Sequence, residues 1–122
     1  MSYITNRKKL KKTLPKIKTK RSLFEHKSYG YSHVGCQRAG NEDSFWMLPQ
    51  HDLWVVADGM GGYAGGQLAS TLTVKGMALK AVELIASAQQ KQTKTGESID
   101  LHAILHKSAE NAGDLVYQAA MS

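Results

Sequence analysis

Apolar residues fall in short runs over the middle of the chain and at a helical period over its second half. The short runs predict three strands, at residues 29–34, 44–48 and 53–57. Pro49 closes the second run, and a three-residue polar turn separates it from the third. Because no long crossover lies between these runs, we expect an antiparallel meander.

The second half predicts two long helices, joined by a polar link at residues 89–96. The apolar positions of the first helix fall mostly on one face: Leu68, Leu72, Leu79, Val82 and Ile85. Asp100 is placed to cap the second helix at its N-terminus. The second helix carries an amphipathic stripe of Leu101, Leu105, Ser108, Ala112, Leu115 and Ala119. We expect Trp46 and Trp54 in the core. The fold class is therefore α+β.

Charge divides the 122 residues into a leader and one domain. Residues 1–27 hold ten of the sixteen Lys and Arg residues and one acidic residue, whereas residues 28–122 hold six basic and nine acidic residues. A basic leader can bind nucleic acid, an acidic partner or an anionic membrane face. The lysine run at 8–12 has no interleaved aromatic residues and Pro15 follows it, so we favour a solvated, disordered leader over a nucleic-acid-binding arm.

The apolar segments and the cysteine content indicate the cellular compartment. No apolar run approaches the ~20 residues that cross a bilayer, and no apolar segment follows the basic start as in a secretory signal. Cys36 is the only cysteine, so the chain cannot form an internal disulfide. These features predict a cytoplasmic protein without a membrane span.

Two acidic stretches carry the candidate chemistry. Asp58 follows an apolar strand and precedes glycines, where a carboxylate is costly unless a cation neutralises it. Glu42 and Asp43 are adjacent in a tight polar turn. A hairpin between the second and third strands would bring them near Asp58. Carboxylates suit Mg²⁺ or Mn²⁺, and the guanidinium of Arg38 suits a phosphate. Gly59 would leave its carbonyl free to face the same cation.

The glycines also fit a second pattern. Residues 59–64 satisfy the G-x-G-x-x-A fingerprint of dinucleotide-binding loops, after a strand and before a helix. However, Asp58 would then meet the pyrophosphate, and the acidic residue expected ~20 positions later corresponds to Glu83, within a helix instead of at a strand end. We therefore set aside nucleotide binding in favour of a metal loop.

The two stretches together resemble a known family. They are Gly35-x-x-Arg38-x-x-Asn41-Glu42-Asp43-Ser44-Phe45 and Val55-Val56-Ala57-Asp58-Gly59-Met60-Gly61-Gly62-x-Ala64-Gly65-Gly66-x-x-Ala69-Ser70. In order and separation they are similar to the first two motifs of the PPM (PP2C-type) protein serine/threonine phosphatases, in the style of the bacterial branch. The resemblance implies the N-terminal half of an α-β-β-α sandwich, as a partial phosphatase domain over residues 28–122.

The resemblance also implies an activity and its site. Such enzymes use two Mn²⁺ or Mg²⁺ ions to hydrolyse phosphoserine and phosphothreonine in proteins, opposing a kinase. Asp58 would bridge the metals, the Gly59 carbonyl would bind one of them, and Glu42 and Asp43 would bind directly or through water. Arg38 would hold the substrate phosphate. Cys36 would be a bystander.

The chain departs from the family pattern at three places. Tyr63 stands where relatives usually carry histidine, and Gln67 where many carry glutamate. The later metal-binding aspartates are missing, since Asp100 and Asp114 lack the Asp-Gly or Asp-Asn context. We therefore expect an incomplete N-terminal portion of such an enzyme, with little or no activity and with weak or incomplete binding of the metal ions. The alternative is a non-catalytic pseudo-phosphatase or binding module, whose basic arm would take acidic partners or nucleic acid.

Overall fold

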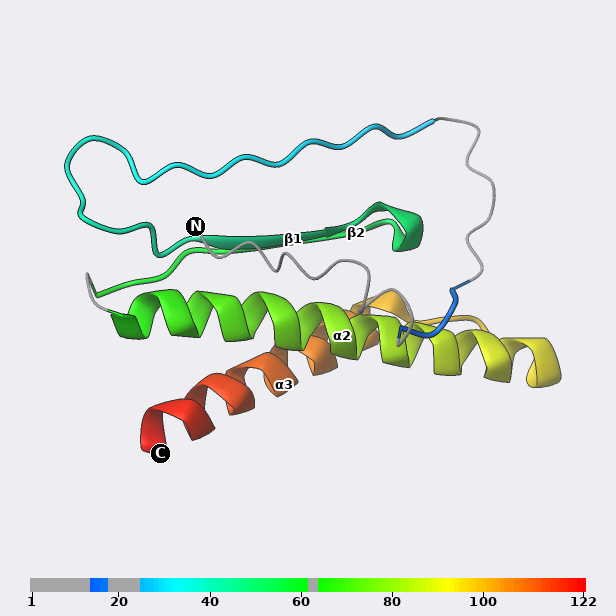
Figure 1. Cartoon of the computed structure of the whole chain (residues 1–122). Coiled ribbons are helices and arrows are strands. Elements are labelled where there is room, and N and C mark those ends of the chain that lie inside the picture. Colours follow the sequence, from blue (N-terminus) through cyan, green and yellow to red (C-terminus); the bar gives the residue numbers. More distant parts are fainter. Residues whose placement is uncertain (1–13, 18–24, 62–63) are drawn as a thin grey trace.

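In the computed structural model the chain folds into a two-stranded antiparallel sheet that packs on one long helix, and a second long helix packs on the first (Figure 1). The structure describes residues 14–17, 25–61 and 64–122. Its elements are β1 (Ser44–Leu48), the 3₁₀ turn η1 (Pro49–His51), β2 (Leu53–Ala57), α2 (Ala64–Thr95) and α3 (Leu101–Met121). The fold is thus α+β, as the sequence predicts. In these described residues no helix combines the length and apolarity that a membrane span needs.

The hairpin forms where the sequence predicts its second and third strands. β1 and β2 pair in an unbroken antiparallel register, from Ser44 opposite Ala57 to Leu48 opposite Leu53. Pro49 fits the first turn of η1, because its ring fixes a helical φ and its missing N–H has no partner to lose. Asp52 then takes a left-handed conformation (φ 48°) and donates its N–H to the Pro49 carbonyl. This compact turn sets the register of the strands.

The two faces of the hairpin have different neighbours. Side chains alternate across a strand, so Leu48 and Val55 share the face that packs on α2. There they join Val74, Ala78 and Val82 of the helix in one buried core. Partly buried side chains surround this core: Leu14, Ile17, Trp46, Leu53, Ala57 and Met77. The core therefore lies between the sheet and α2.

The opposite face of the hairpin is apolar and partly exposed. It presents Phe45, Met47, Trp54 and Val56, of which Trp54 is 42% and Val56 78% exposed. The expectation that Trp54 is a core residue is wrong, because its strand position turns it away from α2. The Trp46 side chain lies on the opposite face of the hairpin, toward α2, and packs against the core.

The third expected strand is absent from the described chain. Residues 29–34 form no strand and run over the outer face of the hairpin instead of along its edge (Figure 1). A Cβ at Gly30 would lie 2.5 Å from the Phe45 ring and 2.9 Å from the Met47 sulfur. Because this segment stacks on side chains, its backbone does not reach the edge hydrogen bonds that a strand requires. Tyr29 and Tyr31 stay exposed.

Helix α2 is longer than the sequence predicts. The polar stretch 89–96, expected to be a link, continues the helix as far as Thr95. Lysine and glutamine are good helix formers, so polarity alone does not end a helix. Gly96 ends it with a left-handed conformation (φ 73°) and donates its N–H to the Gln92 carbonyl.

The expected apolar stripe of α2 is also shifted. Its buried positions are mostly small residues: Gly66, Ser70, Val74, Gly76, Ala78, Ala81, Val82 and Ala86. Leu68 is exposed. The helix contacts the hairpin on one side and α3 on another, and small side chains allow close approach on both (Figure 1).

Helix α3 begins as expected. The Asp100 carboxylate accepts a hydrogen bond from the Ala103 N–H at 3.0 Å, so the predicted N-cap is confirmed. Ser108 and Ala112 are the buried members of the predicted stripe, and the Leu115 side chain reaches α2 at Gly76. The stripe residues Leu101 and Leu105 remain largely exposed.

The basic leader lies mostly outside the described residues. Only 14–17 and 25–27 of residues 1–27 are described. Leu14 and Ile17 pack against the core between the hairpin and α2. At these two positions the leader contacts the domain.

Candidate functional site

Asp43 and Asp58 face each other just beyond the paired ends of β1 and β2. Ser44 pairs with Ala57, so Asp43, one residue before β1, lies opposite Asp58, one residue after β2. Alternation places both side chains on the outer face of the hairpin, where they line a cavity with Phe45 and Trp54. Both residues are exposed. The expected closeness of the two acidic stretches is confirmed by this pairing.

Their closeness perturbs Asp43. Its hydrogen bond with the Asp58 side chain raises the pKa of Asp43, and desolvation and the negative charge of Asp58 add to this rise. The positive charge of Arg38 acts in the opposite direction, and Glu42 contributes a smaller rise. Two carboxylates in this arrangement repel when both are ionised. The pair is therefore a place where a bound cation would relieve repulsion.

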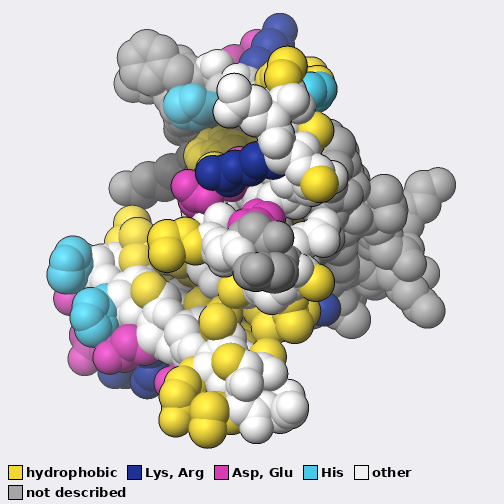
Figure 2. All heavy atoms as spheres, turned by 90° about the vertical axis from the view of Figure 1, so that its left-hand side faces the viewer, with side chains coloured by type: hydrophobic (Ala, Val, Ile, Leu, Met, Phe, Trp, Pro, Cys, Tyr) yellow, Lys and Arg dark blue, Asp and Glu magenta, His cyan; other side chains and the backbone are white. Residues whose placement is uncertain are grey.

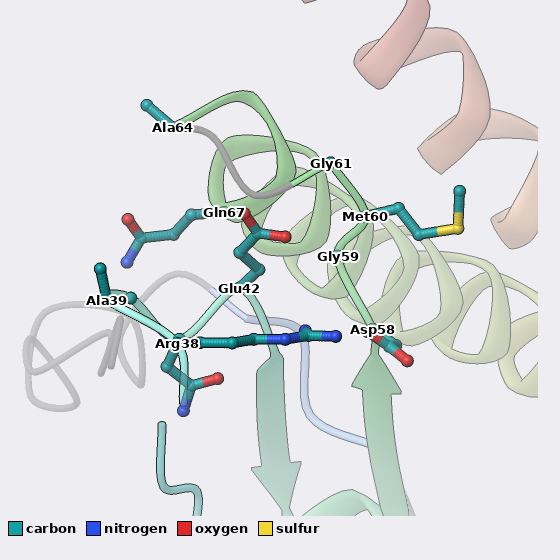
Figure 3. A pocket seen from close by; sticks show the side chains of 11 residues that line it. Arg38, Ala39, Glu42, Asp58, Gly59, Met60, Gly61, Ala64 and Gln67 are labelled. Carbon is teal, nitrogen blue, oxygen red and sulfur yellow. The ribbon is translucent and has the colours of Figure 1, made fainter. Parts of the chain in front are cut away.

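Arg38 belongs to the same site. A pocket of about 630 Å³ lies between the 38–42 turn, the loop after β2 and the start of α2. Its lining includes Arg38, Asn41, Glu42, Asp58, Gly59 and Gln67. Figure 3 shows the Arg38 guanidinium extending across this pocket toward Asp58. The pocket thus combines a guanidinium that suits a phosphate with a carboxylate that suits a metal.

Glu42 lies on the other side of the turn from Asp43. Its residue is 9% exposed, and its Oε2 lies 2.8 Å from the position that a Cβ on Gly66 would take. Gly66 is in the first turn of α2, where the helix dipole favours a negative charge. Figure 3 shows the carboxylate directed toward this helix and away from that of Asp58. The structure therefore does not bring all three candidate carboxylates onto one face.

The glycines of the loop have a packing role. A Cβ at Gly59 would lie 2.5 Å from the backbone oxygens of both Glu42 and Gly66. A Cβ at Gly66 would lie 2.7 Å from the Met60 carbonyl oxygen. The absence of side chains lets the turn, the loop and the helix start approach one another. Gly59 is therefore required for this packing, whatever its carbonyl binds.

A group of hydroxyls, for which the sequence predicts no role, fixes the turn on α2. The Ser70 hydroxyl donates to the Glu42 carbonyl, and Ser44 Oγ lies 2.9 Å from Ser70 Oγ and 3.2 Å from Thr71 Oγ1. Ser44 and Ser70 are buried. The signal that could have revealed them is the polar pair Ser70-Thr71, which stands between Ala69 and Leu72.

Asn41 shapes the turn from the other side. Its side-chain oxygen accepts the Asp43 N–H at 3.0 Å, and its amide nitrogen donates to the Ser32 hydroxyl at 2.6 Å. The first contact is an Asx turn, which fixes the backbone just before β1. The second ties the turn to the segment over the outer face. Asn41 thus positions Asp43.

The donor set fits a metal only in part. Asp43 and Asp58 supply two carboxylates that a divalent cation could join, but Glu42 faces elsewhere. Across the described residues, no group of three or more His, Cys, Asp or Glu is arranged to hold a metal ion. The expected shell for two metals is not assembled from the described part of the chain.

Comparison with known proteins assigns no family. No protein-family model matches the sequence, and comparisons with curated proteins and with solved structures gave no match.

Proposed function

We propose that this chain provides the N-terminal part of a metal-dependent protein serine/threonine phosphatase of the PPM type, within a PP2C-like α-β-β-α sandwich. The observation that carries the proposal is the facing pair Asp43 and Asp58 beside the guanidinium of Arg38. This combination offers carboxylates for a divalent cation and a planar donor fork for a phosphate.

Each residue has a role in the proposal. Asp58 is the bridging ligand, and the Gly59 carbonyl is a second ligand. Asp43 and Glu42 bind the metal ions directly or through water. Arg38 holds the phosphate. The Mn²⁺ or Mg²⁺ ions would activate water and stabilise charge on the phosphoryl oxygens. Substrates are phosphorylated Ser/Thr proteins, with a cognate kinase as the opposing enzyme. A single cysteine favours the reducing cytoplasm as its location.

We expect weak or no hydrolysis by this chain alone. Three carboxylates do not neutralise and position two divalent ions, and one of the three lies against α2. Efficient turnover by this chain that Asp58→Ala abolished would overturn the expectation of an incomplete site.

A non-catalytic binding module is the second candidate. It is favoured by the lack of a metal-holding group of three acidic, His or Cys residues in the described regions. In that case Arg38 would bind a phosphorylated or acidic partner without hydrolysis. A phosphopeptide that binds with unchanged affinity after removal of Mn²⁺, and loses affinity in Arg38→Ala, would favour this candidate.

Manganese titration tests the proposal. We expect isothermal titration of the chain with MnCl₂ to show binding that Asp58→Asn abolishes and that Asp114→Asn, an exposed aspartate on α3, leaves unchanged. Hydrolysis of p-nitrophenyl phosphate is measured in the same samples. Absence of Mn²⁺ binding, or binding that Asp58→Asn does not affect, would overturn the proposal.

A further inference from the structure

A histidine pair lies on α3, away from the carboxylate pocket. His102 and His106 are both exposed and stand four residues apart on a continuous helix. Residues at this spacing are neighbours on one helical face, about 5–6 Å apart at Cβ. In Figure 2, histidine side chains gather beside acidic ones at the surface of the lower, helical half of the molecule. The two imidazoles can therefore converge on one ion.

An acidic side chain stands next in the same row. Glu110 is four residues beyond His106, and its Oε2 lies 3.8 Å from His106 Nδ1. At this distance the carboxylate makes a close electrostatic contact with the imidazole that is too long for a hydrogen bond. The contact is to Nδ1 of His106, and Nε2 of the same ring is the other atom that can ligate a metal.

We propose that His102 and His106 form a binding site for Zn²⁺ and similar divalent transition metals, with Glu110 as a neighbouring negative charge that favours the cation. Neutral imidazole prefers Zn²⁺, Ni²⁺ and Cu²⁺ over Mg²⁺. Two histidines at i and i+4 on one helix face are a known geometry for binding zinc. The site does not depend on the proposed phosphatase function, because it uses none of the same residues.

The site is an open one. Where the chain is described, no three His, Cys, Asp or Glu side chains are grouped to hold a metal. The protein therefore gives two ligands, and water or a further ligand fills the remaining positions of a four-coordinate zinc. This predicts exchangeable binding that either histidine alone cannot maintain.

Zinc titration of the full chain tests the site. The probe is ZnCl₂ in competition with a chromogenic zinc indicator. We expect His102→Ala and His106→Ala each to weaken Zn²⁺ binding by about tenfold or more, and Glu110→Gln to weaken it less. Alanine is the best helix former, so these exposed substitutions preserve α3; circular dichroism confirms that they do.

Matched controls separate this site from the other candidate ligands. His33→Ala, Cys36→Ser and Asp58→Asn remove ligands outside α3 and should leave the tightest Zn²⁺ binding unchanged. MgCl₂ should not displace zinc from the pair. Zinc binding by the double variant His102→Ala/His106→Ala that equals that of the wild type would overturn the proposal, as would loss of the tightest site in any of the three controls.

Discussion

The Ser70 hydroxyl on α2 donates a hydrogen bond to the backbone carbonyl of Glu42, 28 residues earlier in the chain. Ser70 is 2% exposed, so the bond is shielded from water. It fixes the acidic turn to the first turns of α2, directly before Asp43. A buried hydroxyl in the helix thus positions the residues that the carboxylate pair needs.

Removal of this hydroxyl should destabilise the fold. In Ser70→Ala the Glu42 carbonyl loses its donor in a buried environment, which costs about 1–3 kcal/mol of unfolding free energy. Urea denaturation measures the change. Ser87→Ala is the matched control, because its hydroxyl bonds within α2 at an exposed position; its effect should be within about 0.5 kcal/mol. Equal stabilities of the two variants would contradict the role of Ser70.

Alanine substitutions at the neighbouring glycines Gly65 and Gly66 should change the unfolding free energy in opposite directions. A Cβ at Gly66 meets the Met60 carbonyl and the Glu42 carboxylate, so Gly66→Ala should lower the unfolding free energy by about 1–3 kcal/mol. A Cβ at Gly65 meets nothing within 4 Å, so Gly65→Ala should raise it by about 0.5–1 kcal/mol through helix propensity. Denaturation of both variants tests the close approach of turn and helix, and effects of the same sign would refute it.

Neutralising one aspartate of the facing pair should stabilise the metal-free protein. The pKa of Asp43 is raised, chiefly by its hydrogen bond with Asp58. A raised folded-state pKa means that the ionised form at neutral pH opposes folding, and that this cost disappears as the pH falls through the raised value. Asp43→Asn should therefore raise the urea midpoint at pH 7 in the presence of a chelator, and the difference from the wild type should shrink in acid.

Manganese should reverse the difference in urea midpoint between Asp43→Asn and the wild type. If the pair binds a cation, Mn²⁺ stabilises the wild type more than Asp43→Asn, because a ligand that binds only the folded state adds to its stability. Asp114→Asn serves as the control for removal of one negative charge. A wild type that is more stable than Asp43→Asn without metal would refute repulsion within the pair.

His51 should make the hairpin turn sensitive to acid. Burial lowers the pKa of His51 below its ordinary value of 6.5, and its buried Nδ1 has no hydrogen-bond partner in the described structure. Because the unfolded chain binds the proton more tightly, the stability that neutral His51 provides is complete above pH 6.5 and is lost as the pH falls through that value toward the lowered pKa.

Substitution of His51 should flatten this pH dependence. We expect the urea midpoint of His51→Gln to change less than that of the wild type between about pH 7.5 and 5.5. His102→Gln, at an exposed histidine on α3, should keep the wild-type profile. Identical profiles for the wild type and His51→Gln would contradict a buried, neutral His51.

Local sequence signals predicted the parts of the fold that depend on near neighbours. The hairpin of β1 and β2 follows from two apolar runs and a short turn, and the start of α3 follows from Asp100. The failures concern distant contacts. Residues 29–34 alternate weakly, but they lie over the face of the hairpin instead of its edge. The extent of α2 was also missed, because the polar residues 89–95 can continue a helix while their side chains stay in solvent.

The candidate site divides in the same way. Strand pairing in a tight hairpin brings Asp43 and Asp58 together, and the sequence determined this because both flank runs of equal length. Only the tertiary structure decided that Glu42 turns the other way. Side chains alternate across a strand, so adjacent carboxylates face opposite sides, and α2 happens to begin beside the inner one, where its dipole and Gly66 receive the charge.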